Sequence, residues 1–375
     1  MSAWDVVVVG GGIAGASAAA CLAEHLRVVV LEREAQPGYH ATGRSAALFS
    51  EIYGGPAVRA LSRASRAFFR APPAGFAESP LATDRGSLFV AREDQTAELD
   101  AFVAQPDVAR MVRRVSPDEA RTLVPILRPG YVAAAAYERE AADLDVHGLH
   151  HGYLRLLRAR GGEVRTNADV VAIERAGELL RVRTVDAAFE APVVVNAAGA
   201  WADEIAIMAG AAPLGLSPRR RTALTVDAPD GYALAAAPMT IDIDETFYFK
   251  PDAGRLLLSP ADETTTPPCD AKPDDLDVAT AVDRVEKATI LEVRRIASKW
   301  AGLRTFAPDR APVVGFDASV PGFFWLAGQG GYGIQTAPAI ARLVAALVRR
   351  QPVPGDVADA GLRLAEVSPA RFAAP

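Results

Sequence analysis

The start of the chain combines two apolar runs, a glycine-rich turn and an acidic residue in a fixed order. The runs cover residues 6–9 (VVVV) and 28–31 (VVVL), the turn covers residues 10–15 (GGGIAG), and Glu32 follows the second run. Small residues between 16 and 22 are typical of a helix packed closely on a sheet. Strand, turn, helix, strand and acid in this order form the βαβ unit that binds dinucleotides. The sequence therefore predicts an α/β fold with a Rossmann-like unit near its N-terminus.

Each glycine of the turn has a separate predicted role. Gly10 permits the tight turn, Gly12 lets a pyrophosphate approach the helix N-terminus, and Gly15 lets helix and strand pack closely. Glu32 is expected to accept hydrogen bonds from ribose hydroxyls and to repel a 2′-phosphate, which disfavours an NADP-type ligand. The alternative is a glycine-rich turn that binds nothing, and the flanking strands and acid disfavour it.

Composition and charge narrow the class of protein. With 375 residues the chain exceeds one ordinary core, which predicts two domains. Its net charge of −6 gives no reason to expect nucleic acid or an anionic membrane as partner. Of its two cysteines, Cys21 falls in the apolar first helix, so we expect no structural disulfide. We see no membrane-length apolar stretch and no leader pattern, and therefore expect a cytoplasmic protein without stable membrane insertion.

Apolar spacing further along the chain predicts alternating helices and strands. Expected helices cover residues 57–69, 117–123, 153–160 and 290–297, with a closing helix through 348. Expected strands cover 87–91, a pair at 163–165 and 170–174, a buried parallel strand with its turn at 193–199, several between 222 and 259, and 323–327; residues 264–275 are expected to form a surface loop. This interleaving predicts a cofactor domain from residues 1–80, 141–200 and 303–375, and an inserted β-rich substrate domain from residues 81–140 and 201–302.

Several longer strings carry a resemblance to one enzyme family. Besides the N-terminal turn, they are residues 31–40, 42–47, 196–201 (NAAGAW), 247–254, 300–304 (WAGLR) and 329–336 (QGGYGIQT). In these strings the chain resembles the FAD-dependent D-amino-acid oxidase superfamily and, within it, bacterial D-arginine dehydrogenases. The resemblance implies a Rossmann-like FAD domain with an inserted β-rich substrate domain. It also implies non-covalent FAD, since no cysteine follows Cys269 to tether a flavin.

The activity implied by this resemblance is oxidative deamination of a D-amino acid. A hydride passes from the substrate Cα to flavin N5, and the imino acid then hydrolyses to a 2-oxo acid and ammonia. The electrons would go on to a quinone, another carrier or O2. This chemistry needs orientation rather than a protein base or a metal, and no metal-ligand cluster is evident in the sequence. The expected assembly is a monomer or a weak homodimer.

The resemblance also implies the residues that handle the substrate. Arg221 and Arg304 match the arginines of the family pocket, and arginine suits a carboxylate because its planar fork binds both oxygens. Arg304 is the stronger candidate, while Arg219 and Arg220 are expected to be surface charges. Tyr53 and Tyr248 match pocket tyrosines that donate to the carboxylate side. Gly331 and Gln335 match positions that hold the substrate amine.

Two departures from the D-arginine enzymes predict a different substrate. Ser87 stands where they have a glutamate inferred to pair with the distal cation, and Leu48 stands where they have a histidine. With Met239 and Ile241, Leu48 is expected to form an apolar pocket that favours neutral or apolar D-amino acids over D-arginine. Glu51, two residues before Tyr53, would restore selectivity for cations if it reached the pocket.

The resemblance further assigns a set of contacts to the cofactor. They are Gly10, Gly12, Ile13, Ala14, Gly15, Glu32, Arg33, Thr42, Gly43, Arg44, Ser45, Ala46, Val170, Ala198, Gly199, Trp201, Arg304, Gly330, Gly331, Tyr332, Gly333, Ile334 and Gln335. His147, His150 and His151 are expected to be structural or surface residues away from the pocket motifs.

Other functions stay open at this point. They are a D-arginine or D-lysine dehydrogenase, an oxygen-using D-amino-acid oxidase, a secondary-amine oxidase of the sarcosine or proline type, and a flavoprotein that is not an enzyme. Retention of both arginines and both pocket tyrosines disfavours the last, because a mere binding module does not need a carboxylate clamp.

Overall fold

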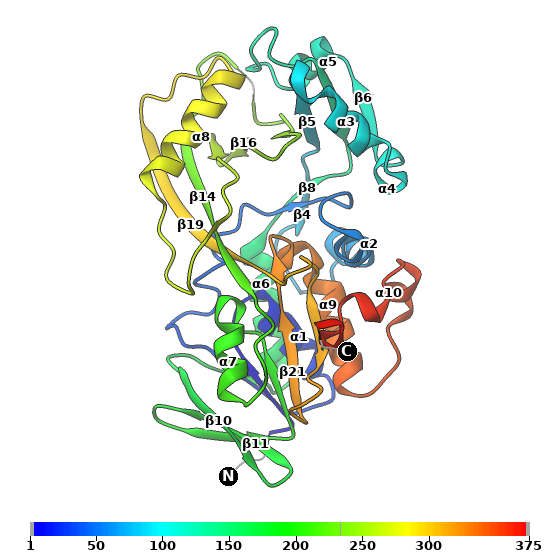
Figure 1. Cartoon of the computed structure of the whole chain (residues 1–375), viewed down its shortest axis with the longest axis vertical. Helices are drawn as coiled ribbons and strands as arrows, with labels where there is room; N and C mark the ends of the chain where they lie inside the picture. Colours follow the sequence, from blue (N-terminus) through cyan, green and yellow to red (C-terminus); the bar gives the residue numbers. More distant parts are fainter. Residues whose placement is uncertain (1–3, 233, 373–375) are drawn as a thin grey trace.

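The glycine-rich start of the chain lies at the centre of a six-stranded sheet (Figure 1). We describe residues 4–232 and 234–372 of a computed structural model. The strand order is β20-β21-β13-β1-β2-β9, parallel except for the β20–β21 pair. The bounds are β1 Val6–Val9, β2 Val28–Leu31, β9 Glu163–Arg165, β13 Val193–Asn196, β20 Val313–Phe316 and β21 Phe323–Ala327. The predicted Rossmann-like α/β arrangement is confirmed.

This sheet is covered on both faces, which explains why its strands are apolar throughout. Successive side chains of a strand point to opposite faces. Val6 and Val8 accordingly pack in the core under α1, α6 and α9, whereas Val7 and Val9 pack with α7 on the other side. The helices are α1 Ile13–Leu22, α2 Pro56–Arg70, α6 Val146–Ala159, α7 Ala202–Met208, α9 Gly333–Val348 and α10 Gly355–Asp359.

A second, larger sheet forms the other half of the molecule, at the top of Figure 1. Its order is β22-β19-β14-β17-β16-β15-β5-β7-β6, with β18 beside β14. The bounds are β5 Ser87–Ala91, β6 Val112–Val115, β7 Ala134–Glu138, β14 Ser217–Asp227, β15 Met239–Asp242, β16 Tyr248–Asp252, β17 Arg255–Ser259, β18 Thr264–Thr265, β19 Ile296–Phe306 and β22 Gln329–Gly330. Helices α3 Thr96–Val103, α4 Pro106–Ala109, α5 Pro117–Leu123 and α8 Asp275–Ala288 belong to the same half.

Two small sheets complete the structure. One consists of β3 Leu48–Phe49, β8 Ala142–Leu144 and β4 Ala82–Asp84, and the other of β10 Val170–Ala176, β11 Leu179–Thr184 and β12 Ala188–Ala191. Short 3-10 turns lie at Glu93–Gln95, Gly199–Trp201, Leu364–Glu366 and Pro369–Phe372. The chain has two large sheets, as expected of two domains. We propose that the domain boundaries are those predicted from the sequence.

One strand ties the halves together next to the expected site. Strand β22 follows β21 of the parallel sheet in the chain, yet it pairs with the end of β19, Thr305 opposite Gly330. The glycine-rich loop before α9 is therefore held between the two sheets. No helix in the described residues is long and apolar enough to cross a membrane.

Three predicted elements are wrong in detail. Residues 290–297 form no helix: β19 begins at Ile296, and the helix lies earlier at Asp275–Ala288, where Asp274 accepts from the Leu276 N–H and caps it. The strands near 163 and 170 do not pair with each other, because β9 joins β2 and β10 joins β11. The helix expected at 153–160 begins at Val146, where the side chain of Asp145 caps it.

Candidate functional site

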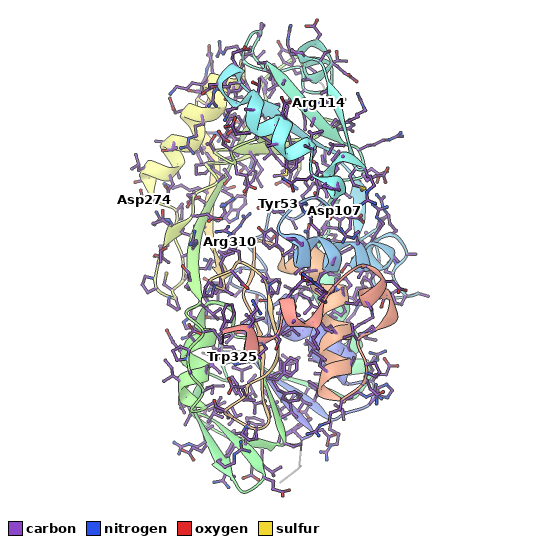
Figure 2. The ribbon with its side chains drawn as sticks, turned by 45° about the vertical axis from the view of Figure 1, so that its right-hand side comes forward. Tyr53, Asp107, Arg114, Asp274, Arg310 and Trp325 are labelled. Carbon is purple, nitrogen blue, oxygen red and sulfur yellow. The ribbon has the colours of Figure 1, made fainter. Side chains whose placement is uncertain are left out.

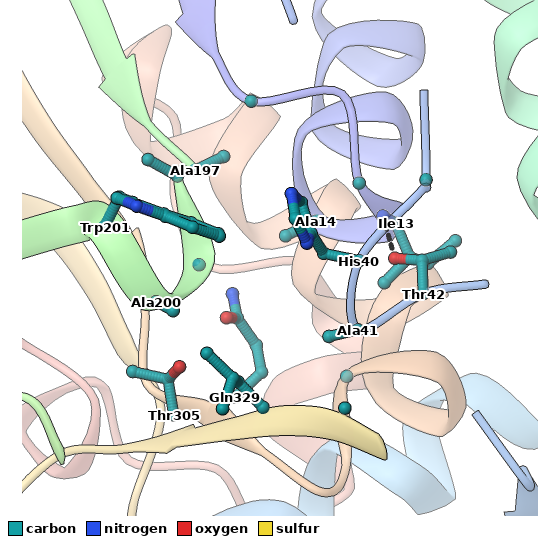
Figure 3. A pocket seen from close by; sticks show the side chains of 18 of the residues that line it. Ile13, Ala14, His40, Ala41, Thr42, Ala197, Ala200, Trp201, Thr305 and Gln329 are labelled. Atoms are coloured by element: carbon teal, nitrogen blue, oxygen red, sulfur yellow. Dashed lines mark hydrogen bonds between the residues drawn. The ribbon is translucent and has the colours of Figure 1, made fainter. Parts of the chain in front are cut away.

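A cavity of about 330 Å³ opens at the carboxyl ends of β1, β2 and β13, where open parallel sheets bind ligands. We call it the cofactor cavity. Its walls come from the glycine turn, the loop at residues 38–46, the turn after β13 and the loop before α9. Figure 3 shows Trp201 and Gln329 facing the turn at Ile13 and Ala14 across it.

The turn geometry explains its glycines one by one. Gly10 has φ +104°, and a Cβ there would lie 2.4 Å from the carbonyl oxygen of Ala197. A Cβ on Gly15 would lie 1.9 Å from the carbonyl oxygen of Gly10, so the helix could not pack as it does. A Cβ on Gly12 meets only Thr42 Oγ1, at 3.2 Å. Gly12 therefore has protein on one side and the cavity on the other.

Side chains also brace the turn. Glu32 accepts hydrogen bonds from the Gly11 N–H at 2.8 Å and from the Glu34 N–H at 2.9 Å, and it lines the cavity. Thr42 Oγ1 accepts from the Ile13 N–H at 2.9 Å at the start of α1, drawn in Figure 3. Both residues therefore fix the backbone of the glycine turn, and both also line the cofactor cavity.

Buried His150 belongs to the same structure, contrary to the expectation that the histidines lie away from the site. Its Nε2 lies 2.8 Å from the carbonyl oxygen of Gly11. Burial lowers its pKa, and the Gly11 carbonyl and neighbouring histidines modify the effect. The neutral ring that this favours donates to Gly11 and supports the turn from behind. His147 and His151 stack on each other with ring centroids 4.0 Å apart.

Most predicted cofactor contacts line this cavity, with four exceptions. The structure places there Gly10, Gly12, Ile13, Ala14, Glu32, Arg33, Thr42, Arg44, Ser45, Ala46, Val170, Ala198, Gly199, Trp201, Arg304, Gly330, Gly331, Gly333 and Ile334. Gly15 lies behind the turn against Gly10, Gly43 lies outside the lining against Gly38, Tyr332 lines a neighbouring cavity, and Gln335 lines the small cavity described below.

Part of the lining was not predicted from the sequence. Tyr39 and His40 line the cavity, and the His40 ring lies 4.8 Å from the ring of Trp201, centroid to centroid. The guanidinium of Arg33 lies 5.0 Å over the same indole. Tyr39 and His40 belong to the loop that the sequence predicted to contact the cofactor through its glycines and hydroxyls. Their rings were not predicted, because the place of His40 depends on its contact with Trp201 in the turn after β13.

The donors around the cavity fit FAD. Buried Gln329 Nε2 has no hydrogen-bond partner among the described residues, yet it lines the cavity, so it can donate to a bound oxygen acceptor. The N-terminal ends of α1 and α9 both contribute to the lining, and helix N-termini favour anionic or electron-rich groups. Glu32, on the opposite side of the turn, offers a carboxylate for hydroxyl groups.

A smaller cavity of about 80 Å³ continues from the cofactor cavity toward the large sheet. Seven residues line both cavities: Ser45, Ala46, Arg221, Tyr248, Arg304, Gly331 and Ile334. The rest of the small cavity is lined by Ala47, Leu48, Ser50, Tyr53, Ser87, Phe89, Met239, Ile241, Glu245, Ala261 and Gln335. The structure therefore brings the predicted arginines, tyrosines and apolar side chains together around one space.

Positive charge dominates the boundary between the two cavities. Arg304 donates to the Tyr53 hydroxyl at 3.2 Å, and no acidic side chain among the described residues pairs with it. Burial alone would raise the pKa of Tyr248, but the charges of Arg304 and Arg221 hold that pKa below its ordinary value. A guanidinium without an acid partner at such a place can pair with the carboxylate of a bound molecule.

Arg221 is held differently from Arg304. Its Nε donates to the Asp262 carbonyl at 2.8 Å, and a second nitrogen lies 3.4 Å from Glu263. Its neighbours are not the surface charges that we expected. Arg219 pairs with Glu263 and Arg220 pairs with Asp277, both in half-buried positions, because β14 runs inside the sheet.

The strand around Tyr248 follows the predicted alternation. Phe247 and Phe249 pack in the core of the large sheet with their rings parallel, and Tyr248 points from the other face into the small cavity. Gln335 is fixed by accepting from the Ser50 N–H at 3.1 Å and donating to Ser62 Oγ at 2.9 Å.

Glu51, a pocket candidate whose reach the sequence left open, does not line the small cavity. Its buried carboxylate pairs with Arg66 on α2 instead. A different acid lies close by. Glu138 is 1% exposed and accepts hydrogen bonds from Ser50 Oγ and Ser87 Oγ, both at 2.8 Å.

Glu138 provides a test of the site by its effect on stability. Burial raises its pKa from 4.5 to about 7, against the hydrogen bonds from Ser87, Ser50 and Glu51. A proton held more tightly by the folded state favours folding at low pH, and this contribution is lost as pH rises from about 4.5 to about 7. Glu138→Gln lacks this titration. We expect its free energy of unfolding, relative to the original protein, to increase by about 3 kcal/mol between those pH values.

Urea unfolding of both proteins with FAD bound, at the two ends of this range, measures the difference. Glu140→Gln, the same change on the surface nearby, is the control and should show no such trend. A difference between Glu138→Gln and the original protein that stays constant with pH would contradict the assignment of the raised pKa to Glu138.

Comparison with known proteins agrees with this geometry. A family model described as DAO, FAD dependent oxidoreductase, matches residues 5–347. The chain belongs to this family of FAD-dependent oxidoreductases. FAD is therefore its cofactor, in agreement with the prediction from the sequence.

Two relatives and one solved structure that the chain resembles match over most of their length. FAD-dependent oxidoreductase domain-containing protein 1 of Xenopus laevis is 25% identical, over 92% of this chain and 79% of that protein. Glycine oxidase of Pseudomonas putida is 26% identical, over 90% and 93% respectively. The crystal structure of L-proline dehydrogenase from P. horikoshii superposes with a TM-score of 0.84 at 22% identity, covering 99% of this chain and 98% of that chain.

Proposed function

We propose that the protein is an FAD-dependent dehydrogenase of D-amino acids, with neutral side chains favoured over that of D-arginine. The observation that carries the proposal is Arg304, which has no acid partner and lies with Tyr53 and Tyr248 where the two cavities meet. An amino acid presents a carboxylate to such a cluster. When bound, FAD supplies the chemistry by accepting a hydride from the substrate Cα.

The residues of the chain position the substrate for that transfer. Arg304 and Tyr53 bind the carboxylate, Arg221 and Tyr248 add positive charge and a hydroxyl beside it, and Gln335 with the backbone at Gly331 receives the amine. Holding the reacting atoms in place lowers the entropic barrier to the reaction. No protein base is required when the amine arrives unprotonated. The resulting imino acid hydrolyses in water to a 2-oxo acid and ammonia.

The far end of the small cavity supports the preference for neutral substrates. Leu48, Met239 and Ile241 line it, and Ser87 takes the place of the acid that D-arginine enzymes present there. The proposed preference for the D-configuration and the likeness to D-arginine dehydrogenases come from the sequence strings described above. Location in the cytoplasm, a monomer or weak dimer, non-covalent FAD and a quinone or carrier as electron acceptor belong to the same proposal.

Substrate is expected to enter through a third cavity of about 590 Å³, which shares Tyr53, Phe89 and Glu245 with the small cavity. Arg310 also lines it, and Figure 2 shows Tyr53 and Arg310 near mid-height, between the two halves of the molecule. Glu245, at φ +52° in the turn between β15 and β16, was not among the predicted site residues.

Anaerobic reduction of the bound FAD tests the proposed function. D-leucine, D-phenylalanine and D-valine are expected to bleach the flavin absorption rapidly, D-arginine more slowly, and the L-isomers hardly at all. We expect at least about a tenfold advantage for D-leucine over D-arginine, which corresponds to about 1.4 kcal/mol. Faster reduction by D-arginine would overturn the side-chain preference, and no reduction by any D-amino acid would overturn the proposed activity.

Two other functions have support from the comparisons. One relative is named a glycine oxidase and one structural neighbour an L-proline dehydrogenase. A secondary-amine or glycine substrate would use the same carboxylate cluster. Sarcosine, glycine and both enantiomers of proline therefore belong in the panel, and transfer to O2 is measured separately as peroxide formed per turnover.

A further inference from the structure

A buried carboxylate stands behind the small cavity without a cation to neutralise it. Glu138 ends β7, and Ser87 begins β5 directly opposite it in the antiparallel pair. The carboxylate of Glu138 accepts hydrogen bonds from two serine hydroxyls and from one backbone N–H, that of Glu51 at 3.3 Å. Among the described residues no lysine, arginine or histidine forms an ion pair with it. Buried charges are normally paired, so this arrangement needs an explanation.

The two serines between Glu138 and the cavity both use their hydroxyl proton in a hydrogen bond to Glu138. Ser50 and Ser87 both donate to the same oxygen of Glu138, and both line the small cavity. A hydroxyl has one proton and two lone pairs. Ser87 Oγ has no other hydrogen bond among the described residues, so it presents only lone pairs to the cavity. Ser50 Oγ also accepts weakly from the Ile52 N–H at 3.4 Å.

From this geometry we infer that Glu138, through Ser50 and Ser87, selects substrates whose side chain carries a hydrogen-bond donor, such as a hydroxyl or an amide. The inference rests on the proposed function of the small cavity as the substrate site, and it refines the preference for neutral side chains. An aliphatic side chain would leave the Ser87 lone pairs without a donor, whereas a donor would complete the chain from substrate to serine to carboxylate. Glu138 is therefore a positioning residue.

The selectivity must depend on the charge of Glu138. When ionised, Glu138 accepts hydrogen bonds from both serine hydroxyls; when protonated, it donates a hydrogen bond to one of them, whose own proton can then face the cavity. Burial raises the pKa of Glu138 to about 7, so this change falls in an accessible range. The charged group that acts on Glu138 is Glu51, whose own carboxylate pairs with Arg66 on α2. Arg221, Arg304 and Glu245 line the small cavity, whereas Arg113 on β6 lies opposite Tyr137 and over its ring, on the other face of the sheet.

Matched pairs of substrates of equal size test the inference. D-threonine is compared with D-valine, and D-asparagine with D-leucine, by anaerobic reduction of the bound FAD. We expect the donor-bearing member of at least one pair to be favoured about tenfold, mainly through a lower half-saturating concentration. That ratio should rise as pH increases from about 6 to about 8, because Glu138 ionises, whereas the substrate amines of each pair, both mostly protonated in this range, follow nearly the same pH trend.

Two variants identify the residue responsible. Glu138→Gln should bring the ratio close to one and remove its pH dependence, while D-valine is still oxidised. Ser87→Ala should lower the ratio without altering FAD content. Glu140→Gln, an exposed acid nearby, should leave both the ratio and its pH profile unchanged. Urea unfolding establishes that the variants are folded.

Ligands that cannot be oxidised at an amine separate this inference from the proposed function. 3-Hydroxybutyrate and 3-methylbutyrate repeat the first pair without the amine, and their binding is followed by the change in FAD absorption. Tighter binding of 3-hydroxybutyrate that disappears in Glu138→Gln would support the inference even if no amino acid were oxidised. Oxidation of D-valine with equal ratios in all pairs, unaffected by pH and by Glu138→Gln, would overturn it while leaving the proposed function in place.

Discussion

Arg304→Ala is expected to lower kcat/KM for D-amino acids about a thousandfold while the protein keeps its FAD. Arg304 is the cation at the boundary of the two cavities that has no acid partner in the described part of the chain. In the proposed complex Arg304 forms a buried ion pair with the substrate carboxylate. Removing one member of such a pair costs about 3–5 kcal/mol, which corresponds to the expected loss in kcat/KM. Because the glycine turn and Gln329 also line the cofactor cavity, the FAD content should change little.

Two comparisons make the Arg304 experiment specific. Arg304→Lys keeps the charge but loses the planar fork, so part of the activity should remain. Arg221→Ala should lose less than Arg304→Ala, since Arg221 is already engaged by Asp262 and Glu263. The measurement is anaerobic flavin reduction over a range of D-leucine concentrations. Unchanged kinetics in Arg304→Ala would remove Arg304 from its proposed role.

Gly12→Ala is expected to produce a folded protein that has largely lost FAD. Gly12 has an ordinary backbone conformation, with φ −69°, and a Cβ there would meet only Thr42 Oγ1 at 3.2 Å. The added methyl group therefore extends toward the cofactor cavity, where a pyrophosphate would approach the N-terminus of α1. We expect the dissociation constant for FAD to rise about a hundredfold, equivalent to about 2.7 kcal/mol.

Gly15→Ala is the matched comparison because its obstruction is protein backbone. A Cβ at residue 15 would lie 1.9 Å from the Gly10 carbonyl oxygen, so α1 and β1 cannot keep their packing. This variant should lose secondary structure and FAD together, whereas Gly12→Ala should keep the circular dichroism of the apoprotein. Full FAD occupancy in Gly12→Ala would show that the cofactor does not approach this turn.

Local patterns in the sequence were sufficient where neighbours in the chain decide the structure. The apolar run 6–9, the glycine turn and Glu32 predicted the centre of the parallel sheet, because a strand buried on both faces must be apolar throughout. The alternation at 247–249 placed Tyr248 opposite its two phenylalanines. Local apolar spacing failed at 290–297, where residues 290–295 form neither helix nor strand and Ile296 begins β19, opposite Val226 of β14.

The sequence by itself determined the Rossmann-like unit, which depends on a short motif with a fixed geometry, and its resemblance to a family gave the identity of the cofactor. Only the tertiary structure decided which polar groups meet. Glu138 lies behind Ser87 because β5 and β7 pair in that register, and His150 supports Gly11 across 139 residues of sequence. Glu51 forms an ion pair with Arg66 on α2 and does not line the small cavity. Such contacts depend on strand register and helix docking, which no local pattern encodes, and they set the charge and hydrogen bonding of the site.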